Sequence, residues 1–131
     1  MSAGRAEAGR RGEEAAARHL VAHGYRIRAR NFRTRRGEID LVAERGGEVV
    51  FVEVRYRTSA SFGTPSETVG PRKRLRILRA ASAYLAANGL GENPCRFDLV
   101  ALTPAGAAGL EILHIENGFD RKGRATGHWS G

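Results

Sequence analysis

Apolar positions repeat with a helical period in two segments of the chain, residues 5–23 and residues 71–88. In the first segment, apolar and small residues recur every three to four positions, and Gly24 follows as a natural stop. In the second segment, Pro71 stands at the start and Gly89 follows the end, an arrangement that favours a helix between them. The sequence therefore predicts two amphipathic helices.

Five other segments have the alternation or the short apolar runs of β-strands: residues 25–30, 37–44, 48–57, 96–103 and 110–115. Both sets of alternate positions are apolar in the first half of 48–57, so we expect a central strand there. The element order α-β-β-β-α-β-β is typical of an α/β fold with a mixed α+β sheet. We expect one domain over residues 1–131, a mobile loop at 58–70 and a flexible tail at 119–131.

Two of the predicted strands carry an acidic residue where a buried strand is normally apolar, namely Asp40 and Glu53. A buried carboxylate without a partner costs roughly several kcal/mol, so each needs a cation or a metal ion. Neighbouring strands would bring the two acids together, with Arg55 two residues after Glu53 on the same face. Glu13 lies on the core-facing side of the first helix and completes the acidic set. This grouping suits a divalent-metal site that acts on phosphate.

Two interpretations of the acidic set stay open at this point. In the first, Glu13, Asp40 and Glu53 converge on one or two Mg²⁺ or Mn²⁺ ions, which prefer carboxylate oxygen. In the second, the same carboxylates form structural ion pairs with nearby arginines. Arg55 accordingly either contacts a phosphate group or neutralises Glu53.

The charge balance favours a polyanionic partner. The 131 residues include 22 Lys and Arg against 14 Asp and Glu, which gives a formal net charge of +8. Arginine predominates among these cations and binds phosphate through two N–H groups, although a GC-rich genome would also favour it. A charge run is also typical of a solvated face. The candidate nucleic-acid-binding residues are Arg33, Arg35, Arg36, Arg57, Arg72 and Lys73.

Composition also argues against several other kinds of site. The single cysteine, Cys95, allows no internal disulfide and no multi-cysteine zinc site. The histidines show no ligand spacing: His19, His23, His114 and His128. No apolar run approaches the ~18 residues of a membrane span, and the N-terminus has no signal-peptide core. We therefore expect a cytoplasmic protein that does not act in a membrane.

The motifs of the chain resemble the YraN-like family of small bacterial proteins. The similarity extends from about Gly9 to Phe119 and rests on residues 12–13, 31–33, 37–41, 51–57, 62–63, 73 and 96–98. That family in turn resembles the restriction-endonuclease-like PD-(D/E)XK superfamily, and within it the archaeal Holliday-junction resolvases. The resemblance implies an αβββαβ core in a three-layer α/β/α sandwich. It also implies a homodimer, because cutting two strands symmetrically needs two sites.

The resemblance further implies roles for individual residues. The catalytic set would be Glu13, Asp40, Glu53 and Arg55. The metal ligands would be Asp40, Glu53, the backbone carbonyl of Val54, and Glu13 directly or through water. The superfamily signature has a lysine where this chain has Arg55. Arginine stays protonated and cannot be a general base, but it can stabilise phosphate charge.

Three functions follow as hypotheses. The first is Mg²⁺- or Mn²⁺-dependent hydrolysis of DNA phosphodiester bonds, with branched DNA as a candidate substrate. The second is a nucleic-acid-binding module that keeps the nuclease fold without catalysis, which the arginine at position 55 motivates. The third is a role in binding an acidic protein surface through the basic face, for which Phe62 and Trp129 are the only candidate apolar contacts.

Overall fold

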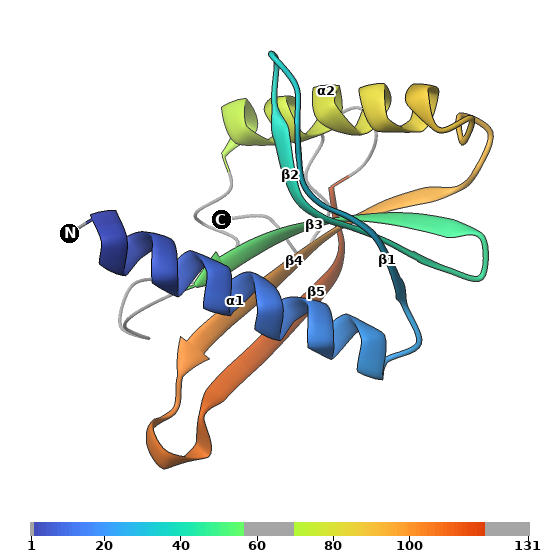
Figure 1. Ribbon diagram of the computed structural model, residues 1–131. Helices are drawn as coiled ribbons and strands as arrows, with labels where there is room; N and C mark the ends of the chain where they lie inside the picture. Colours follow the sequence, from blue (N-terminus) through green and yellow to red (C-terminus); the bar gives the residue numbers. More distant parts are fainter. Residues whose placement is uncertain (1, 57–69, 120–131) are drawn as a thin grey trace.

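A five-stranded sheet forms the centre of the protein, with one helix packed on each of its faces (Figure 1). The structure is a computed structural model that describes residues 2–56 and 70–119. Its elements are α1 (Ser2–Ala22), β1 (Arg26–Arg33), β2 (Glu38–Arg45), β3 (Glu48–Tyr56), α2 (Pro71–Ala87), β4 (Cys95–Pro104), a 3-10 turn (Gly106–Ala108) and β5 (Leu110–Phe119).

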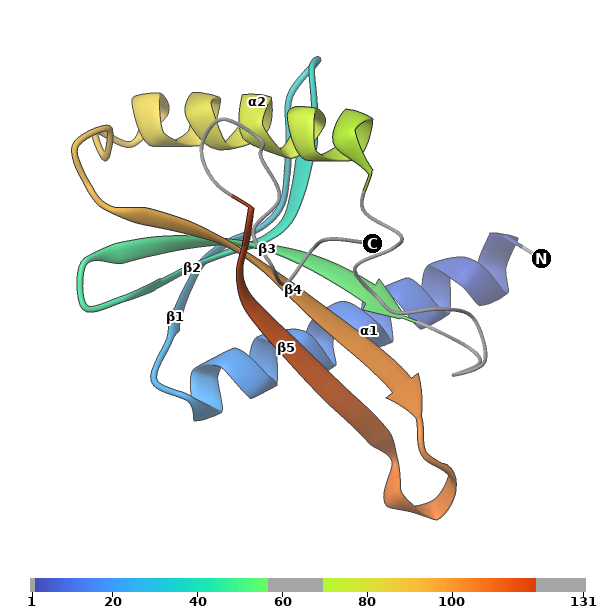
Figure 2. The same cartoon turned by 180° about the vertical axis from the view of Figure 1, so that it is seen from behind.

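The strands lie in the order β1-β2-β3-β4-β5. The first three strands form an antiparallel meander, and β3 then pairs in parallel with β4. A parallel pair needs a crossover connection, and α2 lies within it. The view from behind in Figure 2 shows α2 along one face and α1 along the other. This mixed α+β sheet confirms the predicted fold class and is consistent with a restriction-endonuclease-like core.

The hydrophobic core divides into two clusters, one for each face of the sheet. On the α2 face, Phe51 packs in a cluster that includes Ile77 and Tyr84 of the helix. On the α1 face, Val52 packs in a cluster that includes Leu20. The side chains of β3 therefore alternate between two buried faces, as its sequence predicts for a central strand.

The predicted elements are all present, and two strands are longer than their sequence pattern suggested. The first strand continues to Arg33, because Phe32 and Arg33 still pair with β2. The last strand continues to Phe119 through its pairing with β4. The predicted mobile loop (apart from Gly70), Arg57, Phe62 and the tail after Phe119 lie outside the described residues.

Candidate active site

Asp40 lies where the β2–β3 pairing ends. The register pairs of the two strands run from the hairpin to Leu41 and Val52, so Asp40 is one residue beyond the last pair. Its Oδ2 atom instead accepts a hydrogen bond of 2.8 Å from the backbone N–H of Val54. The carboxylate thus substitutes for a main-chain acceptor, which keeps it close to the second half of β3.

Asp40 and Glu53 form a pair of carboxyl groups on the neighbouring strands, as the sequence predicted. Burial, the negative charge of Glu53 and a hydrogen bond between the two side chains raise the pKa of Asp40 from 3.8 to about 7. The Val54 N–H and the charge of Lys73 act in the opposite direction on this pKa. The pair therefore holds a proton up to near-neutral pH, and a divalent cation placed between the carboxyl groups would displace that proton.

Two cations reach Glu53, whose side chain is only 7% exposed. The Lys73 ammonium from the first turn of α2 lies 2.7 Å from its Oε2 atom, and Arg55 Nη1 lies 3.6 Å from the same oxygen. The sequence predicted Lys73 to be a nucleic-acid contact, which stays a prediction, and the structure adds the contact of its ammonium with the buried acid. The arrangement provides the positive charge that a buried carboxylate requires.

Glu13 approaches the acid pair from α1. Its Oε1 atom accepts a hydrogen bond of 3.1 Å from the Asn31 side chain. Burial raises the pKa of Glu13 above its usual value, the Asn31 hydrogen bond opposes this, and the charge of Asp40 raises the pKa further. The two carboxylates therefore interact electrostatically. Within residues 2–56 and 70–119, no three His, Cys, Asp or Glu side chains are arranged to hold one metal ion together.

A pocket of about 370 Å³ opens next to Lys73, at the start of α2. Its wall is formed by Glu38, Gly70, Arg72, Lys73, Arg76 and Ile77. Among the other described basic candidates, Arg35 and Arg36 are exposed in the β1–β2 turn, and Arg33 at the end of β1 forms an ion pair of 3.2 Å with Glu38. The structure thus places Arg72 and Lys73 together at the pocket and these three arginines at the end of β1 and in the turn that follows it.

Gly37 sets the spacing between β2 and α2, a role that its position in the sequence did not reveal. A Cβ atom at Gly37 would lie 1.8 Å from the backbone oxygen of Arg76. The turn that carries Gly37 is closed by Thr34, whose Oγ1 accepts a hydrogen bond of 3.1 Å from the Gly37 N–H. Direct backbone contact with α2 therefore holds Asp40, three residues further on, beside the first turns of that helix.

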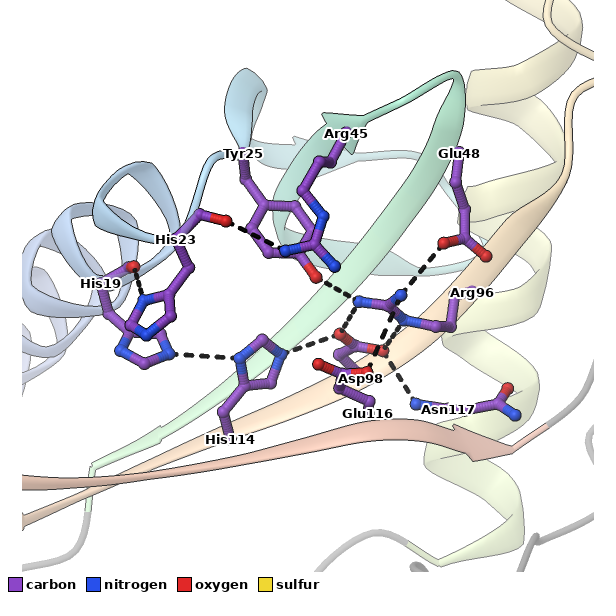
Figure 3. A network of polar contacts seen from close by, with 10 residues as sticks. All are labelled: His19, His23, Tyr25, Arg45, Glu48, Arg96, Asp98, His114, Glu116 and Asn117. Carbon is purple, nitrogen blue, oxygen red and sulfur yellow. Dashed lines mark hydrogen bonds and ion pairs between the residues drawn. The ribbon is translucent and has the colours of Figure 1, made fainter.

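A second polar network, which does not include Asp40 or Glu53, joins α1 to β4 and β5 (Figure 3). At its centre is the buried carboxylate of Asp98, which accepts hydrogen bonds of 2.9 Å from Arg96 and is 2.8 Å from His114 Nε2. Burial alone would raise the pKa of Asp98, but the hydrogen bonds from His114, Arg96 and the Asn117 N–H outweigh it and lower the pKa.

The network also gathers three of the histidines that look scattered in the sequence. His114 Nδ1 faces His19 Nε2 at 3.2 Å, and the rings of His19 and His23 are 4.3 Å apart between centroids. Burial, followed by the charges of the other two histidines, lowers the pKa of His19. These contacts satisfy the buried Asp98 and attach the helix to the sheet, so we interpret this network as structural.

The fold and the site together define a small α+β protein whose central strands present a largely buried pair of carboxyl groups flanked by cations. Comparison with known proteins identifies the family: the chain belongs to the uncharacterised protein family UPF0102, whose family model matches residues 12–102. This confirms the similarity to YraN-like proteins that the motifs indicated.

The relatives cover nearly the whole chain. A UPF0102 protein of Symbiobacterium thermophilum is 50% identical over 111 residues, which are 85% of this chain and 94% of the relative. A relative in Moorella thermoacetica is 49% identical over 116 residues, which are 86% of this chain and 97% of the relative. A relative in Anaeromyxobacter dehalogenans is 48% identical over 126 residues, which are 96% of this chain and 92% of the relative. The names of these relatives state a family and no activity. Neither helix in the described part of the chain has the length and apolar character needed to span a membrane.

Proposed function

We propose that this protein is a Mg²⁺- or Mn²⁺-dependent nuclease of the PD-(D/E)XK type that hydrolyses DNA phosphodiester bonds. The observation that carries the proposal is the carboxyl pair of Asp40 and Glu53, in which the pKa of Asp40 is raised to about 7. Nothing in the packing of a β-sheet requires two acids to share this position. Perturbed carboxyl groups of this kind cluster at functional sites.

The donor set suits a hard divalent cation. Asp40 and Glu53 supply two carboxylates on neighbouring strands, and the Val54 carbonyl lies between Glu53 and Arg55 in β3. The charge of Asp40 acts on the pKa of Glu13, which would join the site through a water molecule. When bound, such an ion would activate a water molecule and neutralise charge on the scissile phosphate. Asp40 would give up its shared proton on metal binding. The negative charge of the carboxyl pair would therefore increase when the metal ion binds near neutral pH.

The basic residues would hold the nucleic acid. Arg55 is partly exposed beside Glu53 and would contact the phosphate whose ester bond is cut. Flanking phosphates would be contacted by Arg33 at the end of β1, by Arg35 and Arg36 in the turn that follows, and by Arg72 of α2. Branched DNA as the substrate and a homodimer as the active form belong to this proposal through the resemblance to resolvases.

The alternative function is a nucleic-acid-binding module without catalysis. The observation that favours it is that Lys73 and Arg55 lie 2.7 Å and 3.6 Å from the Glu53 carboxylate and supply the positive charge that it needs. In that case the carboxyl pair would be structural, and DNA binding would be independent of divalent cations.

A cleavage assay separates the two functions. Linear, flapped and four-way-junction DNA would be incubated with Mg²⁺ or Mn²⁺ and with the wild type, Asp40→Asn or Glu111→Gln. The last variant changes an exposed acid on β5 and is the matched control. We expect Asp40→Asn to lose at least about 100-fold of the cleavage rate, because it replaces a carboxylate that would bind the metal ion directly. The control variant should cleave at the wild-type rate. Circular dichroism would verify the fold. Metal-dependent cleavage that survives Asp40→Asn would refute the proposed site.

A further inference from the structure

Lys73 lies between two features of the molecule. On one side its ammonium is 2.7 Å from the buried carboxylate of Glu53. On the other side the same residue forms part of the wall of the pocket at the start of α2. Its side chain is 41% exposed, so it is not confined to the contact with the acid. A flexible ammonium in this position can contact both the carboxyl pair and a group bound in the pocket.

The pocket carries an excess of positive charge. Of the six lining residues that the structure describes, three are cationic, and the one acid among them, Glu38, already forms an ion pair with Arg33. Among the residues that the structure describes, neither Arg72 nor Arg76 forms an ion pair. The guanidinium groups of these two residues therefore have hydrogen-bond donors available for an anion.

The size and lining of the pocket indicate which anion it accepts. Its volume of about 370 Å³ is in the range of sites for small ligands. Guanidinium groups match the oxygens of phosphate through paired N–H donors. The described lining contains no aromatic ring on which a nucleobase could stack. The pocket is therefore suited to bind the phosphate group of a nucleotide rather than its base.

We infer that this pocket is a binding site for a phosphate group of the nucleic acid, and that Lys73 connects this phosphate to the carboxyl pair. This inference rests on the proposed nuclease function and assigns a residue role within it. The Lys73 ammonium is nearer to Glu53 than the Arg55 guanidinium is, at 2.7 Å against 3.6 Å. Lys73 thus brings a lysine to the acid pair from α2.

The first test uses phosphate binding and requires no catalytic activity. Inorganic phosphate, and separately a 5′-phosphorylated dinucleotide, would be titrated into ¹⁵N-labelled protein. The backbone amides of Gly70, Lys73 and Ile77 should shift in a saturable manner. Lys73→Met and Arg76→Gln should each weaken binding about 10-fold, which is the cost of one charge-assisted contact. Arg79→Gln, an exposed arginine of the same helix outside the pocket, is the matched control and should bind as the wild type does.

Absence of saturable shifts at the pocket, or equal affinity in Lys73→Met, Arg76→Gln and wild type, would overturn the phosphate site. Using two pocket variants keeps the test decisive if one of them unfolds, because Arg76 does not contact the buried acid. A greater response to the dinucleotide than to free phosphate would support a nucleic-acid phosphate as the natural ligand, and a response to free phosphate alone would contradict it.

The second test asks whether Lys73 acts in cleavage. Lys73→Met should lose about 100-fold of the cleavage rate, and adding Arg55→Lys to that variant should restore part of the loss. Full cleavage by Lys73→Met, with Asp40→Asn inactive, would overturn the role of Lys73 and leave the proposed nuclease intact. If even the wild type cleaved no substrate with either metal, the proposed function and this role would both fail, and the titration would still decide the phosphate site.

Discussion

Replacing Asp40 with asparagine should change how the stability of the protein depends on pH. Asparagine has nearly the same shape, and its Oδ1 atom can still accept the hydrogen bond from the Val54 N–H, so the fold should persist. The substitution removes the proton that the carboxyl pair takes up. It therefore isolates the contribution of that proton to the free energy of unfolding.

Whether stability rises or falls with pH follows from the direction of the pKa change. The pKa of Asp40 is about 7 in the folded protein and 3.8 as the ordinary value. Between these two values the folded state binds more protons than the unfolded state, so stability falls as the pH rises. The stabilisation from this proton is complete below pH 3.8 and is lost as the pH passes about 7. Asp40→Asn has no such loss and should become the more stable protein, relative to wild type, as the pH increases.

The size of the change in the free energy of unfolding comes from the same two pKa values. At about 1.4 kcal/mol per pH unit, the interval from 3.8 to about 7 corresponds to about 4 kcal/mol. Asp40 is largely but not fully buried, so solvent screening lowers this figure and we expect a change of about 2–4 kcal/mol. Urea unfolding at several pH values between 4 and 8 measures the difference between variant and wild type, with Glu111→Gln as the control. A difference that stays constant across this range would refute the account of the carboxyl pair.

Other parts of the structure make equally direct predictions. Gly37→Ala should destabilise the protein by at least about 1–3 kcal/mol, because the new methyl group would meet the Arg76 carbonyl at 1.8 Å; an unchanged melting temperature would contradict this contact. Asp98→Asn should cost about 1.5–3 kcal/mol in urea unfolding, since it weakens two charge-assisted hydrogen bonds from Arg96, which keeps Glu48 at 3.0 Å as a counter-charge; a loss as small as that of an exposed acid would contradict this role of Asp98. DNA affinity should fall linearly on a log–log plot against salt, and Arg36→Gln should reduce the slope by about 1. A slope identical to that of wild type would exclude Arg36 from the interface.

Those parts of the fold could be predicted that depend on residue patterns within one helix, one strand or one hairpin. The alternation in β3, with both sets of positions apolar, indicated a central strand, and Pro71 and Gly89 bracketed α2. The pairing of Asp40 with Glu53 could also be predicted from the sequence, because acids in consecutive strands of a hairpin come together through short-range geometry.

The remaining contacts depend on tertiary packing. Lys73 is one of several cations at the start of α2, and no local pattern shows which of them reaches Glu53. The approach of Gly37 to the α2 backbone depends on how the helix lies on the sheet. His19 and His114 are 95 residues apart in the chain, so their spacing carries no signal of the contact that folding creates.

The most direct test of the central claim, that Asp40 and Glu53 form a metal site, is calorimetric titration of Mn²⁺ into wild type and Asp40→Asn. Each titration would be run at pH 6 and pH 8 in buffers of different ionisation enthalpy, with and without branched DNA. Our account predicts binding to wild type with release of about one proton at pH 6 and fewer at pH 8, and loss of binding in the variant. Equal binding by both proteins, or no binding to wild type even with DNA present, would contradict it and favour carboxylates that serve only as partners of Lys73 and Arg55.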